Sequence, residues 1–162
     1  MRHAETDFNN ENRWMGVTDL HLNKSGFEQA KSAAAILGSI EFDAIYCSPL
    51  LRALQTANAV ESKQLHCNVL IEAGFAERGF GVLEGKIKTD ELRGKVETSQ
   101  GVEPLLSVQS RLAKAISRIP SHGTFLVISH SGIFRVLLTR FGCKPSPDIL
   151  YLKNAEWVEL NL

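Results

Sequence analysis

The sequence predicts an α/β fold, a sandwich built around a mostly parallel central sheet. Short apolar runs alternate along the chain with segments whose apolar residues recur three or four positions apart. Such alternation is typical of strands joined by right-handed crossover helices. The chain has 162 residues without internal repeats or low-complexity linkers, so we expect one domain over residues 1–162.

The first elements after the amino terminus are two loops and a helix. Residues 7–12 are polar and rich in asparagine, which predicts a loop, and residues 13–22 mix turn, aromatic and glycine residues, which predicts an ordered loop. We expect a helix to begin at Asn23 or Ser25, because either side chain can cap it. Its apolar residues follow a helical spacing to about Leu37.

The middle of the chain contains two expected strands on either side of a helix. In order, the expected elements are a strand over residues 43–47, a helix over 50–62, a strand over 69–71, a loop over 72–86, and a short helix or mobile lid over 87–101. Ser48 and Pro49 end the first strand. The loop contains four glycines, and the segment after it is polar and only weakly periodic.

The last third carries the clearest buried strand. Its residues 125–129 (FLVIS) form an uninterrupted apolar run, as in strands covered on both faces. The remaining expected elements are a helix over 103–119, a turn over 120–123, a helix over 132–141, a break at Pro145 and Pro147, and a final strand over 151–160 with a turn at Asn154.

One strand is missing from this pattern at the amino terminus. In most α/β domains an apolar strand precedes a catalytic turn, whereas only Met1 precedes Arg2 and His3 here. Either the numbering begins inside a longer natural chain or the leading strand is truncated, and the sequence leaves both explanations open.

The composition favours a cytoplasmic protein without nucleic-acid or membrane partners. Lys and Arg number 18, and Asp and Glu also number 18, so the formal net charge is zero and gives no broad attraction to either partner. The three cysteines lack CxxC spacing, which argues against a disulfide framework or a zinc site and favours a reducing compartment. No apolar run is long enough to cross a bilayer, and no signal peptide opens the chain.

Polar residues suited to phosphate chemistry follow the expected strands. Ligands of such sheets bind beyond the carboxyl ends of the strands. The residues expected there are Arg2 and His3, the segment from Ser48 to Arg52, Glu77 and His130. An imidazole can take up a phosphoryl group, and a guanidinium can hold phosphate oxygens bidentately. Together these residues predict a phosphate pocket with a nucleophile and an acid.

Several motifs, in order along nearly the whole chain, carry a resemblance to a known family. They are RHAET at 2–6, the stretch from Asn9 through MGVTDLHLNKSG to Gln29-Ala30, SPLLRALQTA at 48–57, FAERGFGVLEG at 75–85, ISHSGIFR at 128–135 and NAEW at 154–157. In these motifs the sequence resembles the histidine phosphatase superfamily, also called phosphoglycerate mutase-like. The resemblance implies that family's fold, a three-layer α/β/α sandwich with a mostly parallel central sheet.

The resemblance also implies catalytic roles. His3 would attack phosphorus and form a phosphohistidine, while its other ring nitrogen donates to a backbone carbonyl. Glu77 would be the general acid for the leaving oxygen and then the base that activates water.

A set of donors would hold the phosphate itself. Arg2, Arg52 and His130 would surround its oxygens, with His130 counted among the catalytic residues as well. Asn9 and the amide of Gly16 are weaker candidates at the rim of the site. Because these groups supply the positive charge, we expect neither a metal nor another cofactor.

Two alternatives stay open beside a phosphomonoester hydrolase acting on a small phosphorylated metabolite. The first is a phosphoglycerate mutase of the same family, although Met15 precedes Gly16 where mutases often place a serine, and residues 85–103 are short for the insertion that encloses a mutase's substrate. The second is a non-catalytic phosphate-binding or regulatory module, because an absent leader strand would leave His3 mobile. The sequence identifies neither the substrate nor the oligomeric state, a monomer or a homodimer.

Other conspicuous residues have structural explanations. The glycine-rich run at 79–86 matches neither GxGxxG nor GxxxxGK[ST], which argues against a nucleotide loop. Trp14 is equally suited to stacking on a substrate and to packing, Trp157 is expected in the core and Cys47 is expected to be an inert buried thiol. The other histidines lack metal-ligand spacing and are expected at the surface: His21, His66 and His122.

Overall fold

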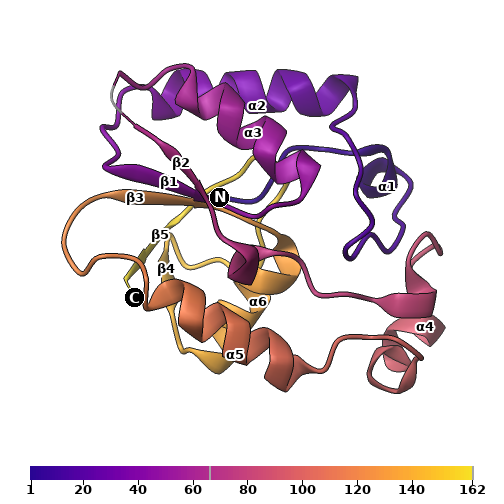
Figure 1. Cartoon of the computed structure of the whole chain (residues 1–162). Coiled ribbons are helices and arrows are strands. Elements are labelled where there is room, and N and C mark those ends of the chain that lie inside the picture. Colours follow the sequence, from indigo (N-terminus) through magenta and orange to yellow (C-terminus); the bar gives the residue numbers. More distant parts are fainter. Residues whose placement is uncertain (66, 162) are drawn as a thin grey trace.

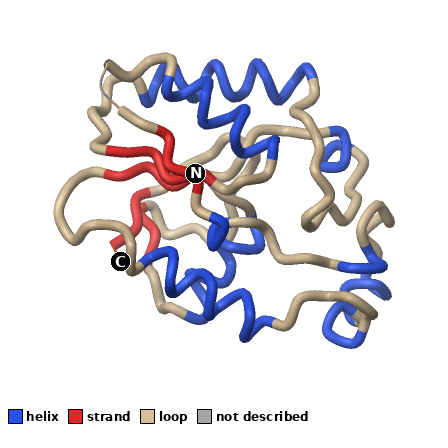
Figure 2. Tube along the Cα trace, viewed as in Figure 1, coloured by secondary structure: helices blue, strands red, loops and turns tan. Residues whose placement is uncertain are grey.

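The computed structural model describes residues 1–65 and 67–161 and has the predicted α/β/α layers. Helices α2 (Lys24–Leu37) and α3 (Leu51–Glu61) cover one face of the central sheet, and α5 (Leu105–Ile116) and α6 (Ser131–Arg140) lie on the opposite side (Figure 1). Figure 2 shows the strands grouped between these two layers of helices. Buried apolar side chains fill both interfaces between the sheet and its helices.

The central sheet is parallel, as predicted. Its order is β2–β1–β3, formed by β1 (Ala44–Cys47), β2 (Val69–Ile71) and β3 (Phe125–Ile128). All four residues of β1 are buried because this strand lies between the other two and under helices on both faces. The sequence-based bounds of these three strands agree with the structure to within a residue.

Residues 1–3 run beside β3 and continue the sheet. Arg2 forms a parallel bridge with Ser129, the Ser129 amide donates to the Met1 carbonyl (3.0 Å), and the His3 amide donates to the Ser129 carbonyl (2.9 Å). The Met1 amino nitrogen donates to the carbonyl of Val127 at 2.8 Å. These bonds hold Arg2 and His3 at the carboxyl end of β3, next to His130.

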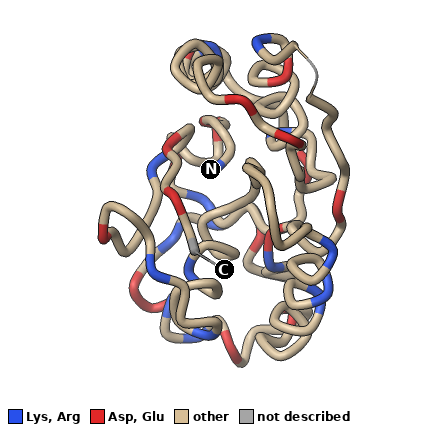
Figure 3. Tube along the Cα trace, turned by 90° about the vertical axis from the view of Figure 1, so that its left-hand side faces the viewer, with Lys and Arg blue, Asp and Glu red and all other residues tan. Residues whose placement is uncertain are grey.

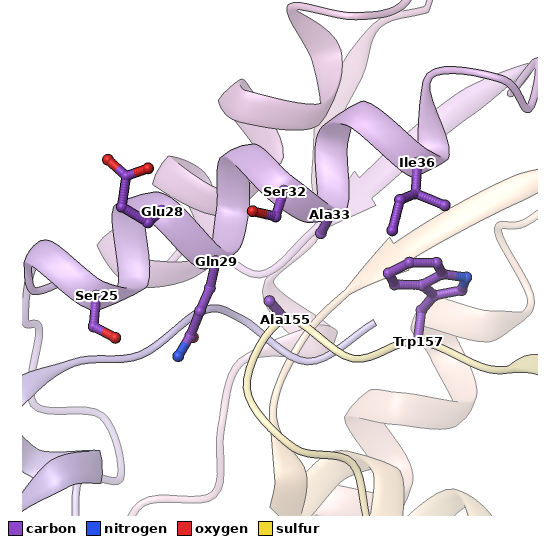
Figure 4. Close-up of a pocket in the computed structure, with 8 residues that line it drawn as sticks. All are labelled: Ser25, Glu28, Gln29, Ser32, Ala33, Ile36, Ala155 and Trp157. Atoms are coloured by element: carbon purple, nitrogen blue, oxygen red, sulfur yellow. The ribbon is translucent and has the colours of Figure 1, made fainter.

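The helices of the first layer begin and pack as their sequences indicate. Asn23 caps α2, because its Oδ1 accepts a hydrogen bond from the amide of Gly26 at 2.8 Å. A Cβ at Gly26 would lie 2.0 Å from the Glu5 carbonyl oxygen, so glycine lets α2 approach the segment that follows His3. Trp157, half-buried, lies against α2 beside Ile36 (Figure 4) and contacts two of the core clusters.

Three predictions about secondary structure are wrong. The expected loop over 7–12 contains a short helix, α1 (Asp7–Asn10), which Thr6 and Asn9 stabilise through reciprocal side-chain to backbone hydrogen bonds. The expected strand over 151–160 is reduced to β5 (Glu159–Asn161), which pairs antiparallel with β4 (Lys144–Ser146). Pro145, where we expected a break, lies within β4 and pairs with Leu160. The turn at Asn154 is present, and Ala155 follows it with φ of 59°.

The remaining elements lie between β2 and α5. The expected loop over 72–86 carries two single 3₁₀ turns, η1 (Ala73–Phe75) and η2 (Gly81–Leu83). The segment over 87–101 contains a short helix, α4 (Asp90–Gly94), followed by the turn η3 (Val96–Thr98).

Positively and negatively charged positions are mixed along the chain. Lys and Arg positions are interspersed with Asp and Glu positions around the trace (Figure 3), in keeping with the zero net charge. Within the described ranges, none of the helices combines the length and the apolar character that a bilayer span requires.

Candidate active site

A cavity of about 310 Å³ lies at the carboxyl end of the sheet. Six of the seven residues predicted for the site line it: Arg2, His3, Asn9, Gly16, Arg52 and Glu77. The seventh, His130, packs against His3, with 5.1 Å between the two ring centroids. Helices α1 and α4, on the right of Figure 1, also contribute side chains to the cavity wall. The topology therefore brings residues from distant parts of the chain to one place.

The imidazole of His3 is fixed and neutral. Its Nδ1 lies 2.6 Å from the Ala4 carbonyl oxygen, and because a carbonyl only accepts, Nδ1 carries the proton and Nε2 keeps a free lone pair. The ring is 3% exposed. Burial, and then the neighbouring guanidinium groups of Arg52 and Arg2, hold the pKa of His3 well below its usual value. An unprotonated Nε2 is therefore available as a nucleophile near neutral pH.

Arg2 and Arg52 flank this imidazole. Arg2 Nη1 donates to the Leu152 carbonyl (2.9 Å), whereas Arg52 donates to the carbonyls of Thr18 (2.9 Å) and Gly16 (2.7 Å). Burial lowers the pKa of Arg52 to about 10, an effect that the Glu77 carboxylate opposes. Carbonyl oxygens orient both guanidinium groups but do not neutralise them, so each favours an anionic ligand.

Ser48, to which sequence reasoning gave no role, contacts the ring of His130. His130 Nε2 lies 2.7 Å from Ser48 Oγ, and this oxygen accepts a hydrogen bond from the Leu50 amide at 3.3 Å. If Ser48 donates its hydroxyl proton to Nε2, Nδ1 is the protonated nitrogen of the neutral ring. Burial, followed by Arg52 and His3, lowers the pKa of His130 well below its usual value, which favours that neutral form.

Four buried side-chain nitrogens lack a hydrogen-bond partner among the described residues. Three of them are Arg2 Nε, Arg52 Nε and His130 Nδ1, and the fourth is Trp14 Nε1. Buried donors in folded proteins are nearly always paired, so a group of unpaired ones marks a place where a ligand supplies acceptors. The first three belong to the side chains predicted to surround a phosphate.

Glu77 reaches the cavity from the loop after β2. Its two carboxylate oxygens accept hydrogen bonds from the amides of Arg78 (2.9 Å) and Gly132 (3.1 Å). Glu77 as a whole is buried, with 7% of its surface exposed. A Cβ at position 132 would lie 2.3 Å from Glu77 Oε1, so glycine at the start of α6 makes room for the carboxylate. These contacts orient Glu77 toward the segment that carries His130.

Arg111 of α5 holds the backbone of the Glu77 loop. It donates to the carbonyls of Gly74 (2.9 Å), Ala76 (2.7 Å) and Glu77 (3.1 Å), and its guanidinium also pairs with both carboxylate oxygens of Glu103. A planar guanidinium with five N–H donors suits such a junction. The position of Glu77 thus depends on a residue 34 positions further along the chain.

The two weaker candidates have structural roles as well. Asn9 Oδ1 accepts hydrogen bonds from the Thr6 amide and Asn154 Nδ2, both at 3.1 Å, so its own amide nitrogen is the group left for a ligand. Gly16 has φ of +55°, and a Cβ there would lie 2.0 Å from Glu84 Oε1. Only glycine fits this backbone conformation without displacing the carboxylate.

Sequence reasoning missed three cationic side chains of the cavity, Lys88, Arg93 and Arg135. Arg135 ends one of the quoted motifs but was given no role, and Lys88 and Arg93 belong to none of the motifs. Trp14 both packs and lines the cavity, since it belongs to a core cluster with Leu83.

The predicted surface positions of His21 and His122 are confirmed. His66 lies outside the described residues. Among the described residues, no three metal-ligating side chains gather into a metal site.

Comparison with known proteins agrees with this geometry. The family model described as Histidine phosphatase superfamily (branch 1) matches residues 1–162. The chain belongs to the histidine phosphatase superfamily. It is 31% identical over 163 residues to the uncharacterized phosphatase PhoE of Bacillus subtilis, a match that covers 96% of this chain and 82% of that protein. It is 29% identical to phosphoglycerate mutase-like protein 4 of Arabidopsis thaliana, over 86% of this chain and 68% of that protein.

Solved structures of this superfamily share the fold. YhfR of Bacillus stearothermophilus superposes with a TM-score of 0.78 at 26% identity, covering 95% of this chain and 85% of that chain. A mycobacterial glucosyl-3-phosphoglycerate phosphatase in complex with VO₃ superposes with a TM-score of 0.73 at 21% identity, covering 99% and 94%. The three-layer arrangement of Figure 1 is therefore the fold of this superfamily.

The lowered pKa of His3 is directly testable by nitrogen NMR. Because protonation is disfavoured by burial and two guanidinium groups, we expect the His3 ring to stay neutral, with Nδ1 protonated, when the pH is lowered through the ordinary pKa of histidine, about 6.5. The signals are assigned by comparison with His3→Asn. A ring that becomes an imidazolium at or above its ordinary pKa would contradict this electrostatic account.

Proposed function

We propose that this histidine phosphatase is a phosphomonoester hydrolase that works through a phosphohistidine intermediate on a small phosphorylated metabolite. The observation that carries the proposal is the group of unpaired buried donors of Arg2, Arg52 and His130 around the free Nε2 of His3. A phosphoryl group set against this nitrogen would offer its oxygens to all three donors. Asn9 and Gly16 stand at the rim of the same cavity.

The first half-reaction transfers the phosphoryl group to the enzyme. His3 Nε2 forms a bond to phosphorus as the bond from phosphorus to the ester oxygen breaks. The leaving oxygen takes the proton of the Glu77 carboxyl group and departs as an alcohol. The guanidinium groups neutralise charge on the phosphoryl oxygens, and the removal of one such donor typically costs about 10²–10³ in rate.

The second half-reaction returns the enzyme to its starting state. The Glu77 carboxylate, now unprotonated, takes a proton from water, whose oxygen attacks phosphorus. The bond between phosphorus and Nε2 breaks, so inorganic phosphate leaves and His3 is neutral again. Glu77 regains its proton in this step, and the proton balance of the cycle closes without a metal or another cofactor.

The fixed position of His3 supports an enzyme over a non-catalytic binding module. The module hypothesis depended on a mobile His3, whereas hydrogen bonds to Ser129 and Ala4 hold this residue on both sides. Hydrolysis is also favoured over a mutase reaction, because only the short elements α4 and η3 lie in the segment where a mutase carries its enclosing insertion. Three free cysteines fit a reducing compartment, so we propose a cytoplasmic location.

Trapping of the phosphoenzyme tests the proposal. With radiolabelled p-nitrophenyl phosphate and a rapid quench, we expect an acid-labile, alkali-stable adduct on His3 of the wild-type protein. His3→Asn should lose the adduct and lower kcat by at least about 10³-fold, because the nucleophile is gone. His21→Asn, which removes an exposed histidine, is the matched control and should keep both. Label on a different residue, or turnover by His3→Asn at the wild-type rate, would refute the proposal.

The role of Glu77 predicts a dependence on the leaving group. A glutamine cannot supply a proton, so Glu77→Gln should lower kcat/KM for glycerol 3-phosphate about 10²–10⁴-fold more than the loss with p-nitrophenyl phosphate, whose leaving oxygen departs readily without protonation. Glu28→Gln, a change in an exposed carboxylate of α2 that does not line the cavity, should alter the two substrates by the same factor. Equal losses on both substrates with Glu77→Gln would exclude general-acid catalysis by this residue.

A further inference from the structure

Three cations line the active-site cavity without belonging to the proposed phosphate cup: Lys88, Arg93 and Arg135. In the part of the chain that the structure describes, their side chains make no hydrogen bond or ion pair with another residue. By contrast, Arg78 of the adjoining cavity and Arg111 of α5 each pair with a carboxylate at 2.8 Å. Positive charge is therefore left unneutralised in one particular part of the cavity.

The charge of the cavity exceeds what one phosphate needs. Its lining includes five cationic side chains, those of Arg2, Arg52, Lys88, Arg93 and Arg135, against the single carboxylate of Glu77. The dianion of a phosphomonoester would neutralise only part of this excess. The crowding also affects Lys88, whose pKa is lowered by burial and then by the proximity of Arg2 and Arg93. A second anion would relieve this repulsion.

A second cavity of about 530 Å³ gives room for the rest of a substrate. It adjoins the first and shares five of its lining residues: Trp14, Phe80, Arg93, Gly132 and Arg135. Arg93 and Arg135 thus stand at the junction, where the leaving group of an ester bound at His3 would lie. Among the other charged residues of this second cavity, Arg78 and Glu97 are already joined by two hydrogen bonds of 2.8 Å, and Arg140 lies at the end of α6.

An aromatic wall fixes the geometry of the junction. Trp14 packs on Phe80 with 4.6 Å between ring centroids. The charged ends of Lys88 and Arg93 lie 5.5 and 5.9 Å from the centroid of the Trp14 ring. The indole is 7% exposed, and its Nε1 is the fourth buried nitrogen without a partner among the described residues. The wall therefore holds cations and an unsatisfied donor at the same place.

We propose that the substrate of this enzyme carries a second anionic group, a carboxylate or a second phosphate, on the part that leaves with the ester oxygen, and that Arg93 and Arg135 bind it. This inference rests on the proposed phosphatase function and deepens it. Arg93 comes from α4 and Arg135 from α6, so the two guanidinium groups grip the substrate from different elements. They are specificity-determining residues, whereas the cup around His3 binds the phosphate that is transferred.

Two pairs of substrates test the proposal and identify the anion. The first pair is 3-phosphoglycerate and glycerol 3-phosphate, which differ by a carboxylate in place of a hydroxymethyl group. The second is fructose 1,6-bisphosphate and fructose 6-phosphate. We expect kcat/KM to be at least about tenfold higher for the more anionic member of one pair, the size of effect that a charge-assisted hydrogen bond provides. Preference in the first pair assigns a carboxylate, and preference in the second a phosphate.

Variants then connect the preference to the two arginines. Arg93→Gln and Arg135→Gln should each reduce the preference about tenfold, by lowering kcat/KM mainly for the more anionic substrate. Lys114→Gln, which removes one positive charge from an exposed position on α5, should leave the preference unchanged.

The failures of the two proposals are distinguishable. If p-nitrophenyl phosphate, glycerol 3-phosphate and fructose 6-phosphate are hydrolysed through His3 but neither pair shows a preference, the second-anion site is refuted and the proposed function stands. A preference that persists in both arginine variants would also refute the assignment of the site. Without hydrolysis of any ester, p-nitrophenyl phosphate included, both proposals fail.

Discussion

The structure depends on one hydrogen bond, from Nδ1 of His3 to the carbonyl oxygen of its neighbour Ala4. This bond decides which nitrogen of the ring carries the proton and directs the other, with its free lone pair, to the chemistry. The surroundings reinforce it, because burial and two guanidinium groups keep the ring neutral. Two buried guanidinium groups close to one another are costly unless an anion binds between them, so the same charges that keep the nucleophile neutral also prepare a phosphate site.

The scaffold around this imidazole is built from polar residues that do no chemistry themselves. Arg111 binds the carbonyl oxygens of Gly74, Ala76 and Glu77 and also pairs with Glu103. Glu84 accepts hydrogen bonds from the amides of Val17, Thr18 and Phe80 and so fixes the loop whose carbonyl oxygens orient Arg52. Ser48 orients His130 through the hydrogen bond between its hydroxyl and Nε2 of the ring. Because each scaffold residue is itself paired, the unpaired donors are confined to the place where a ligand is expected.

Sequence reasoning succeeded where a local pattern coincides with a tertiary rule. The apolar runs gave the three parallel strands, and the rule that ligands lie beyond their carboxyl ends brought Arg2, His3, Arg52, Glu77 and His130 to one edge. It failed where order comes from a few contacts. Helix α1 is one turn, DFNN, that a capping box stabilises, and the segment before β5 contains a turn at 154–155 but no strand. Arg93 of α4 and Arg135 of α6 line one cavity, and no spacing in the sequence encodes that convergence.

The most direct test of the central claim is a crystal structure of the protein with orthovanadate, an ion that adopts the geometry of a phosphoryl group in transfer. The account predicts vanadium bonded to Nε2 of His3, with its oxygens contacted by Nε of Arg2, Nε of Arg52 and Nδ1 of His130, three of the four buried nitrogens that lack a partner among the described residues. Vanadate bound in a different cavity, or through a residue other than His3, would contradict it.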